Sequence, residues 1–206
     1  REAGVVLPDG RIIDGNRRFT CLRQLANENE KFTYFEAVIL PETANEKQIK
    51  LLELMIQHGE EQRVDYDPID MIIGAYKDII EEELITREEY AAATNLPIKE
   101  VENKIKAAKS LNNYLDFLHM PKHYYLAKEF EIDSLFLSVG HSTSVETLLN
   151  RCNDKIREDL KNIIYTSITL NAYKHLSKYI ESLSKMATSG MINTYVNCTK
   201  MYATDF

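Results

Sequence analysis

The hydrophobic positions of this chain follow two different spacings. Near the start, Val5-Val6-Leu7 and Arg11-Ile12-Ile13 are short apolar runs separated by Pro8-Asp9-Gly10, and this order predicts a β-hairpin. Further along, apolar residues recur every three or four positions, as they do on one face of a helix. The pattern predicts an α+β fold that is mostly helical, with a small sheet near its N-terminal end.

Capping residues sharpen the helix predictions. Asp67-Pro68 with Asp70 is a sharp helix start, and Thr86 with Glu89 forms a capping box. One further strand is predicted at Phe35–Leu40, and helices are predicted at Arg17–Asn27, Asn45–His58, Arg87–Thr94, Ile98–Leu111, Thr143–Asn150, Asn153–Leu170, Asn171–Lys185 and Met191–Met201.

Two arginines stand where a predicted strand passes into a helix, in the segment Asp14-Gly15-Asn16-Arg17-Arg18. The N–H groups of a first helical turn carry partial positive charge, so arginines are unfavourable there unless an anion is bound. Gly15 would let a ligand come close to the backbone. The segment alone fits a phosphate site or a turn with two solvated arginines equally well.

A second polar cluster, Glu60-Glu61-Gln62-Arg63-Val64-Asp65, precedes the helix that Asp67 and Pro68 start. Asp-Gly-Asn-Arg-Arg followed by Gln-Arg-x-Asp-x-x-Pro-Ile-Asp resembles the second and third boxes of the ParB partition-protein family. Their usual forms are Gly-Glu-Arg-Arg and Glu-Asn-x-Gln-Arg-x-Asp-Leu-x-Pro-Leu-Glu. A predicted strand and helix lie between the boxes, as the family pattern requires. The family's first box has no counterpart, so the chain is expected to lack the first part of that N-terminal domain.

The resemblance implies a bound nucleoside triphosphate, CTP or a related nucleotide, with Mg²⁺. The positions that would contact the nucleotide are Gly15, Asn16, Arg17, Arg18, Gln62 and Arg63, and those near the metal are Glu60 and Glu61. Asn16 replaces the glutamate of the second box, and Gly59-Glu60 replaces the family's Glu-Asn. The resemblance therefore supports binding more than hydrolysis, and whether the chain is an enzyme stays open.

The third feature is a pair of helices joined by Asn95-Leu96-Pro97. Ala91 and Asn95 match the small-residue and turn positions of a helix-turn-helix, and asparagine tolerates the left-handed conformation that such a turn needs. An ordinary helical hairpin also fits this segment alone, but the ParB resemblance favours the helix-turn-helix.

The second of these helices would read DNA. Its inward positions are Val101, Ile105 and Ala108, which leaves Lys99, Asn103 and Lys106 on the groove-facing side. Residues 96–110 contain four lysines and two glutamates, a net charge of +2 in a chain whose total is −7. Such a local basic face can bind DNA, with modest and salt-sensitive affinity.

These features predict three regions: a partial ParB-like nucleotide-binding lobe at 1–83, a helix-turn-helix domain at 84–140 and a helical region at 141–206. The apolar positions after residue 150 show no evident single core, so part of that surface is expected to pair with a second copy. The expected partners are DNA, a nucleotide, the second copy and, by resemblance, a partition ATPase.

Two other classes of protein stay open. The first is an enzyme of the same wider fold, a nuclease or a nucleotide-dependent transferase, whose carboxylate would be Asp14, Glu60 or Glu61. The second is a non-catalytic adaptor of a mobile element. Its partner would meet residues 42–83, which hold twelve acidic and four basic residues.

Composition adds a few limits. No run approaches the ~18 continuous apolar residues of a membrane span, so no membrane partner is expected. The three cysteines, Cys21, Cys152 and Cys198, lie far apart and are expected to be reduced. The sequence therefore predicts a cytoplasmic protein that is associated with the nucleoid or a plasmid.

Overall fold

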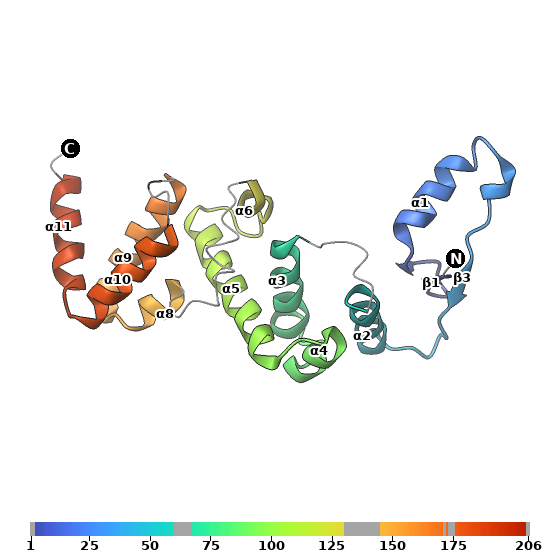
Figure 1. Cartoon of the computed structure of the whole chain (residues 1–206), viewed down its shortest axis with the longest axis horizontal. Coiled ribbons are helices and arrows are strands. Elements are labelled where there is room, and N and C mark those ends of the chain that lie inside the picture. The colour runs from blue at the N-terminus through green and yellow to red at the C-terminus, as the bar shows by residue number, and fades with distance from the viewer. Residues whose placement is uncertain (1–2, 60–66, 130–144, 171, 173–175, 205–206) are drawn as a thin grey trace. The chain divides into compact units, whose positions relative to one another are not determined.

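Helices dominate the fold, and one three-stranded sheet lies at the N-terminal end (Figure 1). The computed structural model describes residues 3–59, 67–129, 145–170, 172 and 176–204. The chain forms two compact units, one made of residues 1–65 and 78–98 and the other of residues 66–77 and 99–206. The mostly helical α+β class is therefore confirmed, while the three predicted regions stay predictions.

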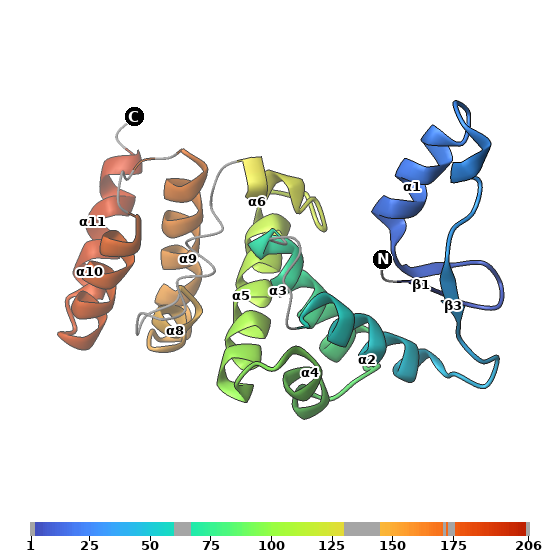
Figure 2. The same ribbon diagram turned by 45° about the vertical axis from the view of Figure 1, so that its right-hand side comes forward.

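The sheet is mixed and has the strand order β2-β1-β3. Strand β1 (Gly4–Val6) runs antiparallel to β2 (Ile12–Asp14) and parallel to β3 (Ala37–Ile39). The turn between β1 and β2 is closed by Leu7, whose N–H donates to the Arg11 carbonyl at 2.8 Å. The predicted hairpin is confirmed with strands shifted by one residue, and the predicted third strand is confirmed in a shorter form (Figure 2).

The helical elements of the first unit follow the sequence signals closely. They are α1 (Asn16–Leu25), the short η1 (Glu30–Phe32), α2 (Glu46–Gln57) and α4 (Arg87–Thr94). The predicted capping box of α4 is present: the Glu89 N–H donates to Thr86 Oγ1 at 3.2 Å, and Glu89 Oε2 accepts from the Thr86 N–H at 2.9 Å. A second box, formed by Asn45 and Gln48, opens α2.

A π-helical turn, η2 (Lys77–Glu81), directly follows the helix α3 (Pro68–Tyr76). The turn places Asp78 in the interior, where its side chain is 5% exposed and lies 3.1 Å from Lys50 of α2. Burial raises the pKa of Asp78, and Lys50 only partly opposes that rise. For Lys50, burial lowers the pKa, but the charges of Asp78 and Glu53 outweigh it and raise the pKa. Asp78 is the more deeply buried partner, since its side chain is 5% exposed and that of Lys50 is 24% exposed.

The helices of the second unit are α3, α5 (Ile98–Phe117), α6 (Tyr125–Glu129), α8 (Val145–Asn150), α9 (Asp154–Thr169), α10 (Leu176–Thr188) and α11 (Ile192–Thr204). Asp67 caps α3 as predicted, accepting from the Ile69 N–H at 2.8 Å. Helix α5 is longer than predicted because Tyr114 and Leu115 extend its buried face beyond Leu111. Helix α10 begins later than the predicted Asn171, and Thr143 of the predicted capping box lies outside the described residues.

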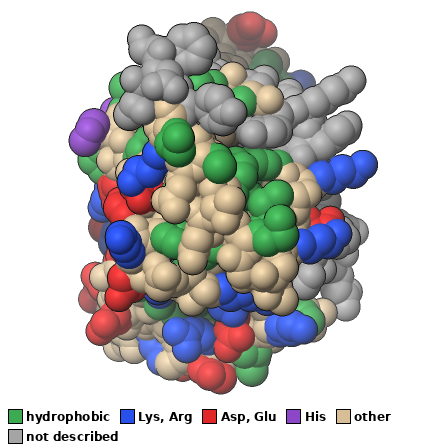
Figure 3. Space-filling model, turned by 90° about the vertical axis from the view of Figure 1, so that its left-hand side faces the viewer, with side chains coloured by type: hydrophobic (Ala, Val, Ile, Leu, Met, Phe, Trp, Pro, Cys, Tyr) green, Lys and Arg blue, Asp and Glu red, His purple; other side chains and the backbone are tan. Residues whose placement is uncertain are grey.

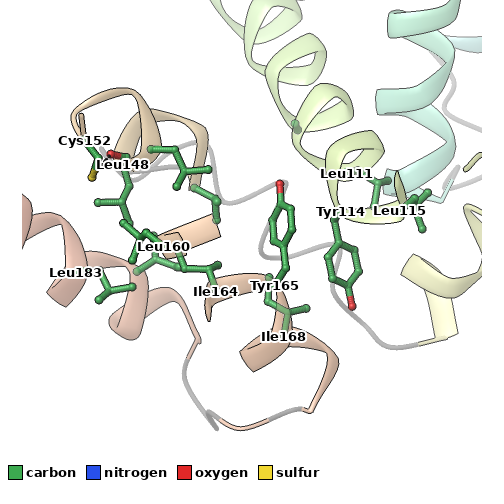
Figure 4. Packing of buried hydrophobic residues seen from close by; sticks show 14 of the residues in the cluster. Leu111, Tyr114, Leu115, Leu148, Cys152, Leu160, Ile164, Tyr165, Ile168 and Leu183 are labelled. Carbon is green, nitrogen blue, oxygen red and sulfur yellow. Dashed lines mark hydrogen bonds between the residues drawn. The ribbon is translucent and has the colours of Figure 1, made fainter. Parts of the chain in front are cut away.

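One hydrophobic core joins α3, α5, α6, α8, α9, α10 and α11. At its centre the ring of Tyr165 meets the ring of Tyr114 edge to face, with centroids 5.4 Å apart (Figure 4). The ring of Phe117 meets Tyr165 in the same way, also with centroids 5.4 Å apart. Leu160 and Ile164 of α9 are fully buried, and Leu183 of α10 is nearly so. The expectation that the helices after residue 150 lack a single core is wrong, because these side chains cover one another within the chain.

Ion pairs connect α6 to the start of α3. Lys128 Nζ donates to Asp70 Oδ1 and Oδ2 at 2.7 and 2.8 Å and lies 3.6 Å from Asp67. These hydrogen bonds, first of all those to Asp70, raise the pKa of Lys128.

Among the residues that the structure describes, no helix combines the length and the hydropathy that a membrane crossing requires.

The Lys50–Asp78 pair yields a stability prediction. Lys50→Met should lower the free energy of unfolding by about 3 kcal/mol at neutral pH, because it leaves a buried carboxylate without its cation. Removing Lys50 also raises the pKa of Asp78 further, and protonated Asp78 carries no charge that needs a cation. The deficit should therefore shrink as the pH falls toward about 4. Urea unfolding followed by circular dichroism at both pH values measures it.

Lys47→Met is the matched control, one turn earlier on the same helix. Lys47 pairs with Glu89 at 2.6 Å, but both side chains are at least one-third exposed, so its loss should cost less than about 1 kcal/mol. Equal losses in the two variants, or a Lys50→Met deficit that does not change with pH, would contradict the assignment of Asp78 as the costly buried charge.

Candidate functional site

The N-terminus of α1 presents backbone N–H groups without an internal acceptor. Gly15 precedes the helix with φ 94°, a left-handed conformation, and no side chain caps the helix. The first helical hydrogen bond runs from the Phe19 N–H to the Gly15 carbonyl at 2.8 Å. The N–H groups of Asn16, Arg17 and Arg18 therefore point out of the helix end, and the first turn holds no acidic residue. This is the arrangement that accepts an anion.

Two structural features explain a glycine at position 15 without any ligand. Its positive φ favours glycine, and a Cβ at this position would lie 2.9 Å from the Phe35 ring. The ring of Phe35 also meets Phe19 edge to face, with centroids 5.5 Å apart. The room that the missing side chain leaves is thus filled by Phe35, and an anion would have to approach on the side of the N–H groups.

The two arginines differ in their surroundings. Arg18 lies over the Phe35 ring at 5.8 Å, and its Nη2 is 4.0 Å from Asp14 Oδ2, a long contact between partly exposed groups. Arg17 is exposed and forms no ion pair with any described residue. The Asn16 amide donates to the Ile12 carbonyl at 3.4 Å. Arg17 is therefore the arginine whose charge is available to an anion.

The second polar cluster would supply the other half of the expected nucleotide site. Glu60, Glu61, Gln62 and Arg63 lie outside the described residues. Elsewhere, in the described part of the chain, no three His, Cys, Asp or Glu side chains gather in a group that could hold a metal ion. The contiguous segment from Gly15 to Arg18 is accordingly the part of the expected site whose geometry is known.

The turn between α4 and α5 has the local geometry that was predicted. Asn95 ends α4 in the left-handed conformation with φ 55°. The N–H groups of Asn95 and Leu96 both donate to the Ala91 carbonyl, which closes the C-terminal end of the helix. Pro97 follows, and α5 begins at Ile98.

Helix α5 exposes one polar stripe. Val101, Ile105 and Ala108 are buried as predicted. The residues Lys99, Glu102, Lys106, Lys109 and Asn113, here called the α5 strip, recur at i, i+3, i+7, i+10 and i+14 and therefore line one side of the helix. Glu102 is half-buried and the other four are exposed; none of the three lysines pairs with an acidic residue in the described structure.

Two polar residues of α5, Asn103 and Lys104, are not part of its exposed polar stripe. Asn103, predicted to contact DNA, is half-buried and lies beside the α5 strip rather than on it. Lys104 is also half-buried, and burial lowers its pKa although the charge of Glu100 opposes this. The basic surface of α5 therefore consists of Lys99, Lys106 and Lys109.

The buried polar group around Asp78 was not predicted from the sequence. Tyr90 of α4 is 3% exposed, and burial, with a smaller effect of the Asp78 charge, raises the pKa of its hydroxyl to about 12. Neither the spacing of Lys50, Asp78 and Tyr90 nor their flanking residues reveals that they share one interior. The single local signal is an aspartate beside the apolar pair Ile79-Ile80.

No protein-family model, curated protein or solved structure shows detectable similarity to this chain.

The geometry of α1 yields a prediction about anions. Arg17→Ala should weaken the binding of a nucleoside triphosphate about tenfold, since a charge-assisted hydrogen bond contributes ~1.5–3 kcal/mol. Titration with fluorescent CTP, ATP and GTP measures the dissociation constant. Arg23→Ala, on the last turn of the same helix, is the control and should leave it unchanged. Equal affinities for the unsubstituted chain and Arg17→Ala would exclude this helix end as the phosphate site.

Proposed function

We propose that this chain is a ParB-like DNA-binding protein in which α5 contacts duplex DNA and the N-terminal end of α1 binds the phosphates of a nucleotide such as CTP. The observation that carries the proposal is the α5 strip, which begins directly after a left-handed asparagine turn and whose three lysines pair with no acidic residue that the structure describes. Such a turn followed by a basic helix is the local pattern of a helix-turn-helix.

The dimensions of the strip suit the major groove. At 1.5 Å rise per residue, Lys99 and Lys109 lie about 15 Å apart along α5, and the major groove is about 12 Å wide. Lysines at the two ends of such a segment can reach the phosphates that border the groove. Glu102 then lies between them on the α5 strip, where a carboxylate can read a base edge.

Charge sets the expected strength of binding. Three lysines can release about three counterions from DNA, each of which adds about 0.9 to the slope of log affinity against log salt. The rest of the chain opposes association, because the total charge is −7. The proposal therefore requires affinity that is modest and falls steeply with salt.

The nucleotide part of the proposal rests on α1. The N–H groups of Asn16 to Arg18, which point out of the helix end, and the charge of Arg17, which pairs with no described residue, suit a phosphate group. By the ParB resemblance, Gln62 and Arg63 would complete the site, Glu60 and Glu61 would lie near Mg²⁺, and the bound nucleotide would regulate DNA binding. Hydrolysis is not part of the proposal.

The same resemblance assigns the protein to DNA partition or its regulation in the cytoplasm. It would act there as a homodimer, with a partition ATPase as a partner.

The proposal predicts the behaviour of a double variant. Lys99→Ala with Lys106→Ala should weaken duplex DNA binding and lower the magnitude of the salt slope by about two units, since each phosphate-contacting lysine contributes about one. Fluorescence anisotropy with a mixed-sequence duplex over a series of salt concentrations measures both quantities.

The control removes the same charge elsewhere. Lys155 of α9 and Lys178 of α10 are exposed and form no ion pair within the described structure, so their double replacement by alanine should leave the slope unchanged. The proposal is rejected if the unsubstituted chain binds no duplex at low salt, or if both double variants lose the same affinity.

A further inference from the structure

A cavity of about 360 Å³ opens beside the start of α4. Lys47 of α2, Ile79 and Ile80 of η2, and residues 83–88 line it, and all of these belong to the first unit. Pockets that bind small groups begin at about 300 Å³. The volume therefore suits one long side chain rather than a large cofactor.

The floor of this cavity is apolar and is held in place by the π-helical turn. The N–H groups of Leu84 and Ile85 donate to the Asp78 carbonyl at 3.0 and 3.4 Å, which folds the loop after η2 back over the turn. Ile79 and Ile85 are buried, and Ile80 is half-buried. Because backbone hydrogen bonds fix the loop, the floor exists before any ligand arrives.

The charges around the cavity are mostly negative. Residues 81–89 hold five glutamates and one arginine, a net charge of −4, and Lys47 changes this to −3. Lys47 already pairs with Glu89 at 2.6 Å. Glu83 and Glu88, which line the cavity, are exposed and form no ion pair with any described residue. Their carboxylates are therefore available to a cation.

Glu83 occupies a backbone position that does not favour glutamate. Its φ is 49°, in the left-handed region that glycine and asparagine adopt at lower cost. A residue that keeps an unfavourable conformation beside a cavity is a candidate for a functional role. What glutamate offers here, and glycine or asparagine does not, is a carboxylate at the cavity.

We propose that this cavity holds the side chain of a lysine or arginine from a basic segment of a partner protein. The aliphatic stem of that side chain lies on Ile79, Ile80 and Ile85. Its cation meets Glu83 and Glu88 at the edge of the cavity. Lysine and arginine commonly bury their stems on apolar surface while the charged head stays at a polar edge.

Charge complementarity favours a basic segment over other occupants. The net charge of −3 repels an acidic segment, and an uncharged apolar segment would make no use of the two carboxylates. The side of the molecule on which α11 lies is different. Figure 3 shows hydrophobic side chains there, with acidic and basic side chains both around them. A basic segment is therefore expected to prefer the cavity.

Methyl NMR of the full chain tests the proposal. The isoleucine methyl groups are labelled, and the chain is titrated with Nα-acetyl-lysine N-methylamide and, separately, with the arginine compound. The signals of Ile79, Ile80 and Ile85 should shift and saturate, whereas that of Ile164, in the core of the second unit, should stay in place. The norleucine compound keeps the stem but lacks the ammonium group, so it should shift the three signals little.

Substitutions of the two carboxylates measure their contribution. Glu83→Gln and Glu88→Gln should each weaken binding of the lysine compound about two- to fivefold, as expected for partly exposed ion pairs, and the double variant about tenfold. Glu28→Gln removes an exposed carboxylate elsewhere in the first unit and should leave the affinity unchanged.

Glu83→Asn separates binding from structure. Asparagine adopts the left-handed conformation more readily, so the thermal midpoint should stay the same or rise while the affinity falls as in Glu83→Gln. A lower midpoint with unchanged affinity would make Glu83 a structural residue and overturn its role in binding.

The remaining outcomes identify other occupants or none. The proposal is overturned if the three isoleucine signals do not move, or if Glu28→Gln weakens binding as much as Glu83→Gln. Equal responses to the lysine and norleucine compounds would assign the cavity to an apolar segment. A larger response to Nα-acetyl-glutamate N-methylamide would assign it to an acidic segment bound by Arg87. The probes contain no phosphate or nucleic acid, so none of these results depends on the DNA or nucleotide proposals.

Discussion

The burial of one side of α5 is the constraint on which the rest of the second unit depends. Val101, Leu111 and Leu115 are fully buried, and Tyr114 nearly so. Together they fix the rotation of the helix about its axis. Turning α5 by one residue, 100°, would bring lysines into the core, where an unpaired cation costs several kcal/mol. The position of the basic row on the surface is therefore a consequence of the apolar residues on the other side of the helix.

Features that depend on neighbours in the sequence could be predicted. The capping box at Thr86, the left-handed Asn95 and the first residue of α3 follow from short-range hydrogen bonds and backbone preferences, and all three occur as expected. The ends of the long helices were less predictable. The extension of α5 to Phe117 depends on Tyr165, a residue far along the chain that packs against Tyr114 and Phe117.

Pairings between distant segments could not be predicted. The interaction of Lys50 with Asp78 requires α2 to meet a π-helical turn, and nothing in the local sequence specifies that meeting. The C-terminal helices illustrate the same limit, since their alternating patterns do not reveal the core that these helices share. Amphipathic patterns show that a helix has an apolar side but not which other helix covers it. The expected nucleotide site combines a local and a distant feature. The local part, Gly15 to Arg18, has the predicted structure, whereas Arg63 lies outside the described residues.

The aromatic ring of Phe35 restricts which residues can occupy positions 4 and 15, although both are far from it in sequence. A Cβ at Gly15 would come within 2.9 Å of that ring, and a Cβ at Gly4 would meet the same ring and the carbonyl of Asp14. Alanine at either position thus requires Phe35 to move. A smaller residue at position 35 would remove the ring contact at both glycines, but the Asp14 carbonyl, 2.9 Å from a Cβ at Gly4, and the positive φ of Gly15 would remain. Across related sequences, a large aromatic residue at position 35 should consequently be accompanied by glycine at positions 4 and 15.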